Sequence, residues 1–279
     1  KKYVPVIIKR TDEVRRHPDD ALENAIHEGL EQLKRPFISL ALSAMAAGLT
    51  VGFAAVAVAV VTLAAAPLES RISTRVATAL VYPLGFVVCV MSGAQLYTEH
   101  TATALYPFLD RQAPLWMLLR LWGTVIVGNL LGAAASGGLL TLADPVVGAH
   151  EGYVIIGRHL VEFDAFSLTV SALLAGWLMA LGAWLVASTA IGFSQMAAIY
   201  IVTFLIGLGG FHHSIAGAAE MFTALFISDH FTAAEAARFI GLALLGNLIG
   251  GSLFVGVLNY AHIRKTQPAA DDTRDVDEE

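Results

Sequence analysis

The stretch Ser92-Gly93-Ala94-Gln95-Leu96-Tyr97-Thr98-Glu99-His100 interrupts a long apolar run, and the motif Gly128-Asn129-Leu130-Leu131-Gly132-Ala133 follows it. A second interruption, Gly209-Gly210-Phe211-His212-His213-Ser214, is followed by Gly246-Asn247-Leu248-Ile249-Gly250-Gly251. Gly93 precedes Gly128 by 35 positions and Gly210 precedes Gly246 by 36, so the two halves of the chain share one layout. Paired apolar segments that glycine and polar residues interrupt at corresponding places are typical of transporters and channels built from repeats. The interruptions are therefore where we expect a solute to be handled.

The composition is that of an integral membrane protein. Hydrophobic residues make up 56% of the 279 residues, charged residues only 14%, and the mean hydropathy is +0.67. Soluble domains carry roughly 25% charged residues. A membrane-spanning helix needs about 20 apolar residues, and six runs meet that need: Phe37–Ala66, Val76–Leu109, Pro114–Ala143, Ala165–Ala190, Gln195–Ile227 and Ala233–Ile263. These runs use most of the chain, which argues against a second, soluble domain and against a water-soluble helical core.

Three regions follow from this pattern: a tail over residues 1–36, a six-helix pore domain over 37–264, and an acidic tail over 265–279. Within the first region, Asp19–Leu33 places its apolar side chains on one face, which predicts an amphipathic helix. Such a helix lies along the membrane surface or packs on neighbouring subunits. The strongly charged start of the chain predicts that there is no cleavable signal peptide.

Lys and Arg are distributed unequally between the two sides of a six-span topology. Thirteen lie on the side that holds both ends of the chain, and four lie on the other side. Loops rich in Lys and Arg remain in the cytoplasm, so we expect a multi-pass protein of the inner (plasma) membrane with both termini cytoplasmic. This inference holds for six spans and fails for five or seven.

Glycine and asparagine recur together in the third and sixth runs. Two glycine pairs, each four positions apart, predict helix backbones that cross closely in lipid: Gly128 with Gly132, and Gly246 with Gly250. Asn129 and Asn247 differ, because an amide at membrane depth needs hydrogen-bond partners, and the backbone freed by a broken helix supplies them. We expect both asparagines to brace the breaks, with Gly93 and Gly210 as structural residues within them.

The two interruptions are predicted to form the centre of the protomer. We expect Gly93–Thr98 and Gly209–His213 to be non-helical and to converge from opposite sides. Non-helical backbone at that depth must be buried or face a water-filled cavity, and half-helix N-termini there favour an anion. His213 is the residue on which we expect function to depend, because histidine donates hydrogen bonds and titrates near neutral pH. His212 is a candidate proton partner, or simply faces a neighbouring loop.

At these positions the chain resembles the formate/nitrite transporter family. The similar stretches are Gly93-Ala94-x-Leu96-Tyr97-Thr98, Gly128-Asn129-Leu130-Leu131-Gly132, Phe211-x-His213-Ser214-Ile215-Ala216 and Gly246-Asn247-x-x-Gly250-Gly251. The resemblance implies an all-α, aquaporin-like fold of two inverted three-helix repeats, with the second and fifth helices broken. It also implies a pentamer with one pore per protomer, which passes small monovalent anions such as formate, nitrite or hydrosulfide, often with protons.

The resemblance further implies roles for single residues. The family's central pore histidine falls on His213, and the threonine of its mobile loop falls on Thr98. Five residues fall on the family's hydrophobic constrictions: Leu96 and Tyr97, with Phe86 nearby, on the inner one, and Tyr82 and Ile206 on the outer one.

Departures from the family pattern indicate a divergent branch. Gly217 stands where the family usually has an asparagine, and His212 stands where it commonly has a glutamate. The family's lysine ahead of the fourth span has no lysine counterpart here. The spacing falls near Leu160, with Arg158 and His159 as the nearest basic groups.

The expected function is that of a membrane channel or transporter for a small monovalent anion or its weak acid, proton-linked through His213. We expect no enzyme activity, no catalytic residue, no metal site, no cofactor and no nucleic-acid partner. The expected partners are the solute, membrane lipid and further copies of the chain.

Other functions are compatible with the sequence. A conduit for a neutral solute or a cation would suit Glu99, which makes the vestibule less favourable for anions, and Gly217, which lacks a polar anchor. A membrane redox subunit would use His100 and His213 as axial haem ligands, and a structural scaffold would carry no solute. Glu99 and Glu220 are costly if buried alone, so we expect each to contact a His, an Arg or water.

Overall fold

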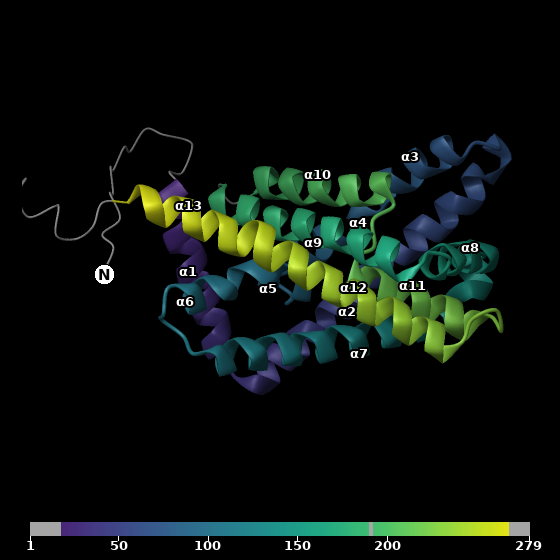
Figure 1. Ribbon diagram of the computed structural model, residues 1–279. Coiled ribbons are helices and arrows are strands. Elements are labelled where there is room, and N and C mark those ends of the chain that lie inside the picture. Colours follow the sequence, from purple (N-terminus) through teal and green to yellow (C-terminus); the bar gives the residue numbers. More distant parts are fainter. Residues whose placement is uncertain (1–17, 190–191, 268–279) are drawn as a thin grey trace, which may run out of the picture.

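The computed structural model describes residues 18–189 and 192–267. Most of the predicted N-terminal tail (1–17), most of the acidic tail (268–279) and the predicted end of the fourth run at Ala190 lie outside these residues. In the described part of the chain every regular element is a helix. The long helices run side by side, and shorter helices lie at the two ends of the bundle and within it (Figure 1).

Five helices are long and apolar enough to cross a membrane. They are α2 (Phe37–Ala65), the joined pair α3 (Arg71–Val81) and α4 (Pro83–Met91), α7 (Leu115–Val147), α9 (Ala165–Ser188), and α12 (Ala233–Gly251) continued through the π-helical turn Ser252–Val257 into α13 (Leu258–Thr266). The pair α10 (Phe193–Gly209) and α11 (Ser214–Ile227) is bent by 55° and counts as a sixth span if taken together. The chain is therefore a multi-pass membrane protein.

The second predicted run differs most from the structure. The spanning helix covers Arg71–Met91 instead of starting at Val76, because Ser70 caps it five residues earlier: its hydroxyl accepts a hydrogen bond from Ser73 N at 3.2 Å. After Met91 the chain continues as two short helices, α5 (Tyr97–Thr103) and α6 (Leu105–Leu109), rather than as one half-helix.

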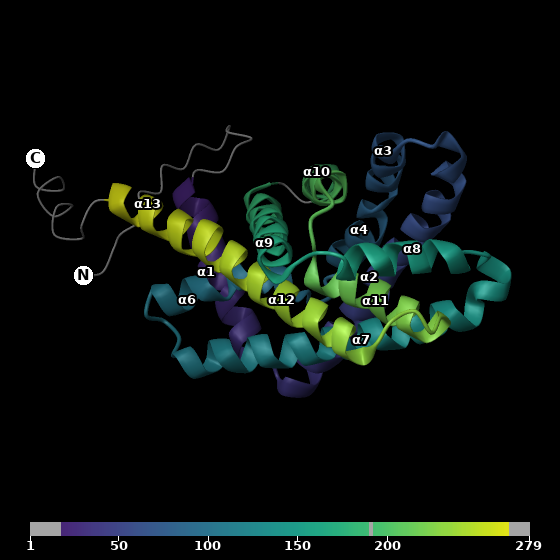
Figure 2. The same cartoon turned by 45° about the vertical axis from the view of Figure 1, so that its right-hand side comes forward.

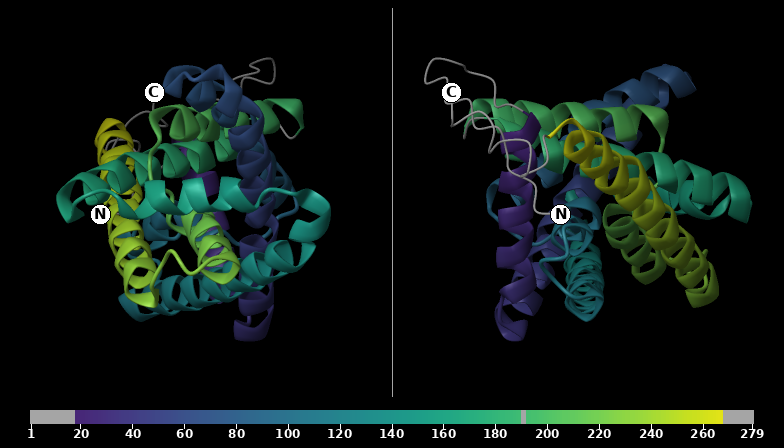
Figure 3. Two further views of the ribbon diagram at one scale, coloured as in Figure 1. Left: turned by 90° about the vertical axis from the view of Figure 1, so that its right-hand side faces the viewer. Right: turned by 60° about the vertical axis from the view of Figure 1, so that its left-hand side comes forward.

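Two further helices lie at opposite ends of the bundle. The helix α1 (Pro18–Lys34) matches the predicted amphipathic segment and stands at one end (Figure 3, right), whereas α8 (His150–Val161) was not predicted and lies across the other end (Figure 3, left). The apolar face of α1 buries Leu22, Ile26 and Leu33 against other helices of the same chain. Those residues therefore do not face lipid, as a helix lying on the membrane surface would require.

A buried arginine ties α1 to the end of the last helix. Arg264 in α13 pairs with Glu23 of α1 at 2.6 Å and with Asp110 at 2.9 Å. The hydroxyl of Tyr260 donates a second hydrogen bond to Asp110 at 2.9 Å. Three segments that are distant in sequence are therefore held at one point.

Helix α2 crosses α7 and helix α9 crosses α12, with glycine at each crossing. A Cβ atom on Gly132 would collide with the backbone of Met45 and Leu49 in α2, and one on Gly250 would collide with the backbone of Leu173 in α9. The continuous rod of α12 and α13 is visible beside α9 in Figure 2. The predicted glycine pairs thus lie where the helices approach most closely.

The glycines of α7 provide a matched test of this packing. Gly132→Ala should lower the unfolding temperature, because overpacking of a tight crossing costs about 1–3 kcal/mol. A Cβ atom on Gly138 in the same helix meets nothing within 4 Å, so Gly138→Ala should be neutral or stabilising by up to about 1 kcal/mol. Thermal unfolding of both variants in detergent checks this, and equal destabilisation of both would contradict it.

Candidate functional site

Both interruptions are breaks between helices. Residues 92–96 separate α4 from α5, and residues 210–213 separate α10 from α11. The prediction of non-helical backbone was wrong at one end of each segment: Tyr97 and Thr98 form the first turn of α5, and Gly209 is the last residue of α10. Gly93 (φ 72°) and Gly210 (φ 63°) adopt the left-handed conformation that glycine takes without steric cost. Figure 1 places α5 toward the end of the bundle that carries α1, and α11 toward the end that carries α8.

Asn129 in α7 satisfies the backbone of the first break. Its Oδ1 accepts a hydrogen bond from Tyr97 N at 2.9 Å, and its Nδ2 donates to Gln95 O at 2.8 Å and to Ala44 O at 2.7 Å. The bond to Tyr97 N fills the role of a helix cap, so the chain becomes helical at Tyr97 and not two residues later.

Asn247 in α12 does the same for the second break. Its Oδ1 accepts from Ser214 N at 2.8 Å, and its Nδ2 donates to His212 O at 3.1 Å and to Ala172 O at 2.7 Å. Each asparagine therefore bonds the first amide of a half-helix, one carbonyl of the break and one carbonyl of a neighbouring long helix. The two halves share these contacts as well as their spacing.

His213 joins the two breaks. Its Nδ1 accepts hydrogen bonds from Ile215 N at 3.2 Å and Ala216 N at 3.1 Å, so the ring caps α11 and its proton lies on Nε2. Nε2 is 2.9 Å from the hydroxyl oxygen of Thr98. The ring of Phe86 meets the imidazole edge-on, with centroids 5.0 Å apart. Both His213 and Thr98 are buried, so the site is a neutral N–H donor and a hydroxyl in an apolar setting.

The five residues predicted to form constrictions are all buried and belong to one apolar cluster. They are Tyr82, Phe86, Leu96, Tyr97 and Ile206. The rings of Tyr82 and Phe86 are 5.1 Å apart. Tyr82 and Ile206 also line a cavity that reaches His213.

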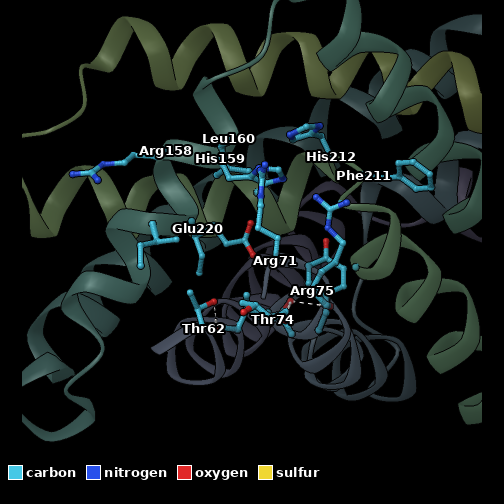
Figure 4. A pocket seen from close by; sticks show the side chains of 18 of the residues that line it. Thr62, Arg71, Thr74, Arg75, Arg158, His159, Leu160, Phe211, His212 and Glu220 are labelled. Atoms are coloured by element: carbon cyan, nitrogen blue, oxygen red, sulfur yellow. Dashed lines mark hydrogen bonds between the residues drawn. The ribbon is translucent and has the colours of Figure 1, made fainter. Parts of the chain in front are cut away.

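This cavity, of about 600 Å³, opens at the end of the bundle that carries α8; we call it the outer cavity (Figure 4). Its wall is mixed in charge, and its basic members are Arg71, Arg75, Arg158 and His159, against the acidic Glu69, Glu162 and Glu220. Arg71 and Arg75 lie one turn apart on α3 and so share one face. The predicted span began at Val76 and therefore left both arginines in the preceding loop.

The two departures at His212 and Gly217 are connected through Phe239. A Cβ atom on Gly217 would collide with the ring of Phe239, which occupies the space that a side chain there would need. The same ring contacts the edge of His212, at a centroid distance of 5.9 Å. Gly217 therefore does not leave a gap beside the pore. His212 is held by Ser171, whose hydroxyl lies 2.8 Å from Nδ1.

The carboxylates of Glu99 and Glu220 have no basic partner. In the described ranges neither forms an ion pair or a hydrogen bond with a His or an Arg. Glu220 lies on the wall of the outer cavity, and Glu99 is half-buried in the first turn of α5. Each glutamate was expected to contact a His, an Arg or water, and of these three only water is left as a partner for both carboxylates.

Comparison with known proteins agrees with this architecture. The sequence profile described as "Formate/nitrite transporter" matches residues 19–261, which include both breaks and both bracing asparagines. The chain belongs to the formate/nitrite transporter family. Its similarity to the inner membrane protein YfdC of Escherichia coli K12 is 29% identity over 249 residues, or 86% of this chain and 78% of YfdC.

Other members of the formate/nitrite transporter family are more distant. The formate channel FocA of Haemophilus influenzae is 25% identical and is aligned over 80% of this chain and 86% of its own length. Among solved structures, an FNT family ion channel superposes with a TM-score of 0.76 at 18% identity, covering 87% of this chain and 98% of the channel. A pentameric formate channel with formate bound superposes with a TM-score of 0.69 at 21% identity, covering 81% and 97%. These likenesses support the fold.

The bracing asparagines can be tested directly. Asn129→Leu and Asn247→Leu should each lower stability by about 2 kcal/mol or more, because buried backbone groups of the break lose their partners. The free energy of unfolding, or the unfolding temperature in detergent, checks this. Asn24→Leu on the exposed face of α1 is the control, and the prediction is wrong if the three variants unfold alike.

Proposed function

We propose that the protein is a channel or carrier that passes a small monovalent anion, or its weak acid, through a pore within each protomer. The observation that carries this proposal is the contact of His213 Nε2 with the hydroxyl of Thr98 at 2.9 Å. It puts one N–H donor and one hydroxyl where the two breaks meet, inside an apolar cluster. A small oxyanion can take the place of the Thr98 oxygen as the acceptor of the Nε2–H hydrogen bond.

The solute class is formate, nitrite or hydrosulfide. Two similar proteins carry formate in their names, FocA and the pentameric formate channel. Arg71 and Arg75 place two positive charges on one face of the outer cavity, which favours anions locally although the wall as a whole is mixed in charge. The proposed activity is transport and involves no chemical conversion.

Transport is proposed to be proton-linked. An anion leaving the outer cavity must pass Tyr82, Phe86 and Ile206, and a bare charge in such a setting costs several kcal/mol even after relaxation. Taking up a proton turns the anion into a neutral weak acid and removes that cost. His213 stabilises the species at the centre of the pore by donating through Nε2, while its Nδ1 remains engaged with α11.

The membrane setting and assembly belong to the same proposal. Six spans, with α10 and α11 as one of them, bring both termini to the cytoplasmic side of the inner membrane, and α8 then lies on the outer side. The matched hydrogen bonds of Asn129 and Asn247 support two inverted three-helix repeats. A pentamer is proposed because a similar structure is a pentameric channel.

Removal of the central hydrogen-bonding groups should slow transport strongly. His213→Phe and Thr98→Val should each slow formate or nitrite flux into proteoliposomes by about 10- to 100-fold, the loss expected when a hydrogen bond to a charged group of about 1.5–3 kcal/mol is removed. Thr98→Ser keeps the hydroxyl and should retain most of the flux. His150→Phe, at an exposed position of α8, is the matched control.

Flux of neutral solutes or cations by the wild-type protein, without flux of formate, nitrite or hydrosulfide, would refute the proposed function. Unchanged anion flux in His213→Phe would mean that the solute does not pass His213.

The proposed assembly is checked by native mass spectrometry of the protein purified in detergent. We expect a mass of five chains, because the similar formate channel is a pentamer. A stable monomer or trimer would contradict the pentamer while leaving the fold unaffected.

A further inference from the structure

The outer cavity contains a cluster of polar groups around Gly210 that the proposed role of His213 leaves unused. Arg75 comes from α3, His159 from α8, and Gly210 follows the end of α10 (Figure 4). A Cβ atom on Gly210 would lie 3.4 Å from Nη2 of Arg75 and 3.6 Å from Nε2 of His159. The two nitrogens are therefore at most about 7 Å apart, and they border a space that the absent side chain leaves open.

We propose that Arg75 and His159 form an anion-binding site in the outer cavity, which takes up a small planar oxyanion (a carboxylate or nitrite) together with one proton. The class of ligand rests on the proposed function. The site itself is additional, because it lies in front of the apolar constriction and shares no side chain with the contact between His213 and Thr98.

The guanidinium of Arg75 is available to a ligand. Among the residues that the structure describes, no carboxylate pairs with it, although Glu69, Glu162 and Glu220 line the same cavity. Arginine presents parallel N–H donors that match the two oxygens of a carboxylate. Charge-assisted hydrogen bonds of about 2.8 Å to the two oxygens of one anion span the separation between Arg75 and His159.

Glu162 determines which nitrogen of His159 faces the ligand. Its Oε1 lies 2.8 Å from Nδ1 of His159. An ionised carboxylate only accepts hydrogen bonds, so Nδ1 carries a hydrogen and Nε2 is the atom that gains or loses a proton. Without that proton Nε2 presents a lone pair to the anion, and with it Nε2 presents a donor and a positive charge. Glu162 is thus a positioning residue, and proton uptake at Nε2 strengthens anion binding.

The surrounding charges link the proton to the anion. The titratable and charged groups that share the cavity with His159 come from several elements: Glu69, Arg71, Arg75 and Tyr82 from α3 and its two ends, Arg158 and Glu162 from α8 and its end, His212 and His213 from the second break, and Glu220 from α11. A proton on Nε2 is repelled by the guanidinium of Arg75 and attracted by Glu162. An anion between Arg75 and His159 removes the repulsion, so each ligand favours binding of the other.

The ring of His212 closes one side of the proposed site. It stacks on His159 at a centroid distance of 5.6 Å and an interplanar angle of 24°. Ser171 fixes the ring, because its Oγ accepts a hydrogen bond from His212 N at 3.3 Å and lies 2.8 Å from Nδ1. His212, His159 and Arg75 line the same cavity, so a ligand between Arg75 and His159 is shielded on the side of His212.

The experiment measures formate binding by saturation-transfer NMR on the full-length, detergent-purified protein that carries His213→Phe. This background removes the central donor, so the remaining signal reports the outer site. We expect Arg75→Gln to weaken binding by about tenfold or more, and Arg75→Lys to restore part of it. Lys265→Gln, at an exposed position of α13 outside the cavity, is the control and should leave the dissociation constant unchanged.

Proton uptake that accompanies anion binding is detected by comparing the dissociation constant for formate at two pH values. Binding at pH 6 should be at least about fivefold tighter than at pH 8, and His159→Phe should remove this difference. Unchanged binding in Arg75→Gln, or a pH-independent dissociation constant before mutation, would overturn the site even if the wild-type protein transports formate. Absence of anion flux in the wild-type protein would instead overturn the proposed function, and formate binding at Arg75 would still be measurable.

Discussion

Every feature of the pore depends on one requirement: backbone amides and carbonyls at membrane depth must have hydrogen-bond partners. Two side-chain amides meet this requirement, Asn129 for the first break and Asn247 for the second. They reach the breaks because their helices cross close neighbours at glycine, as Gly132 against α2 shows. The close packing of the helices and the breaks within them therefore depend on each other. A larger residue in place of the glycine would push the two helices apart and move the asparagine side chain away from the backbone groups of the break.

In the second break the proposed functional residue, His213, also has a structural role. It caps α11 with one ring nitrogen and directs the other at Thr98 on the opposite half-helix. The same side chain therefore holds the helix end in place and presents an N–H donor. A ring fixed in this way cannot turn over without losing both backbone bonds, so this donor keeps one orientation.

Much of this organisation could be predicted from the sequence, and the failures have physical causes. The apolar runs, the two breaks and the bracing asparagines follow from hydropathy and from the cost of burying an unpaired amide. The start of α5 at Tyr97 does not, because it depends on a side chain 32 residues away in sequence. Hydropathy also missed α8, which is too polar to resemble a span, and with it the charged wall of the outer cavity. Gly217 was interpreted as a lost polar group, whereas the ring of Phe239 fills its place through a contact that no local pattern contains.

The cluster at Arg264 has a consequence for motion. One guanidinium holds Glu23 near the beginning of α1, Asp110 between α6 and α7, and α13 at the end of the last span. The three segments cannot shift independently without leaving a charge that is 6% exposed without its carboxylate partners. The N-terminal helix and the end of the last span are therefore fixed to each other, and α13 continues into α12, the helix that carries Asn247.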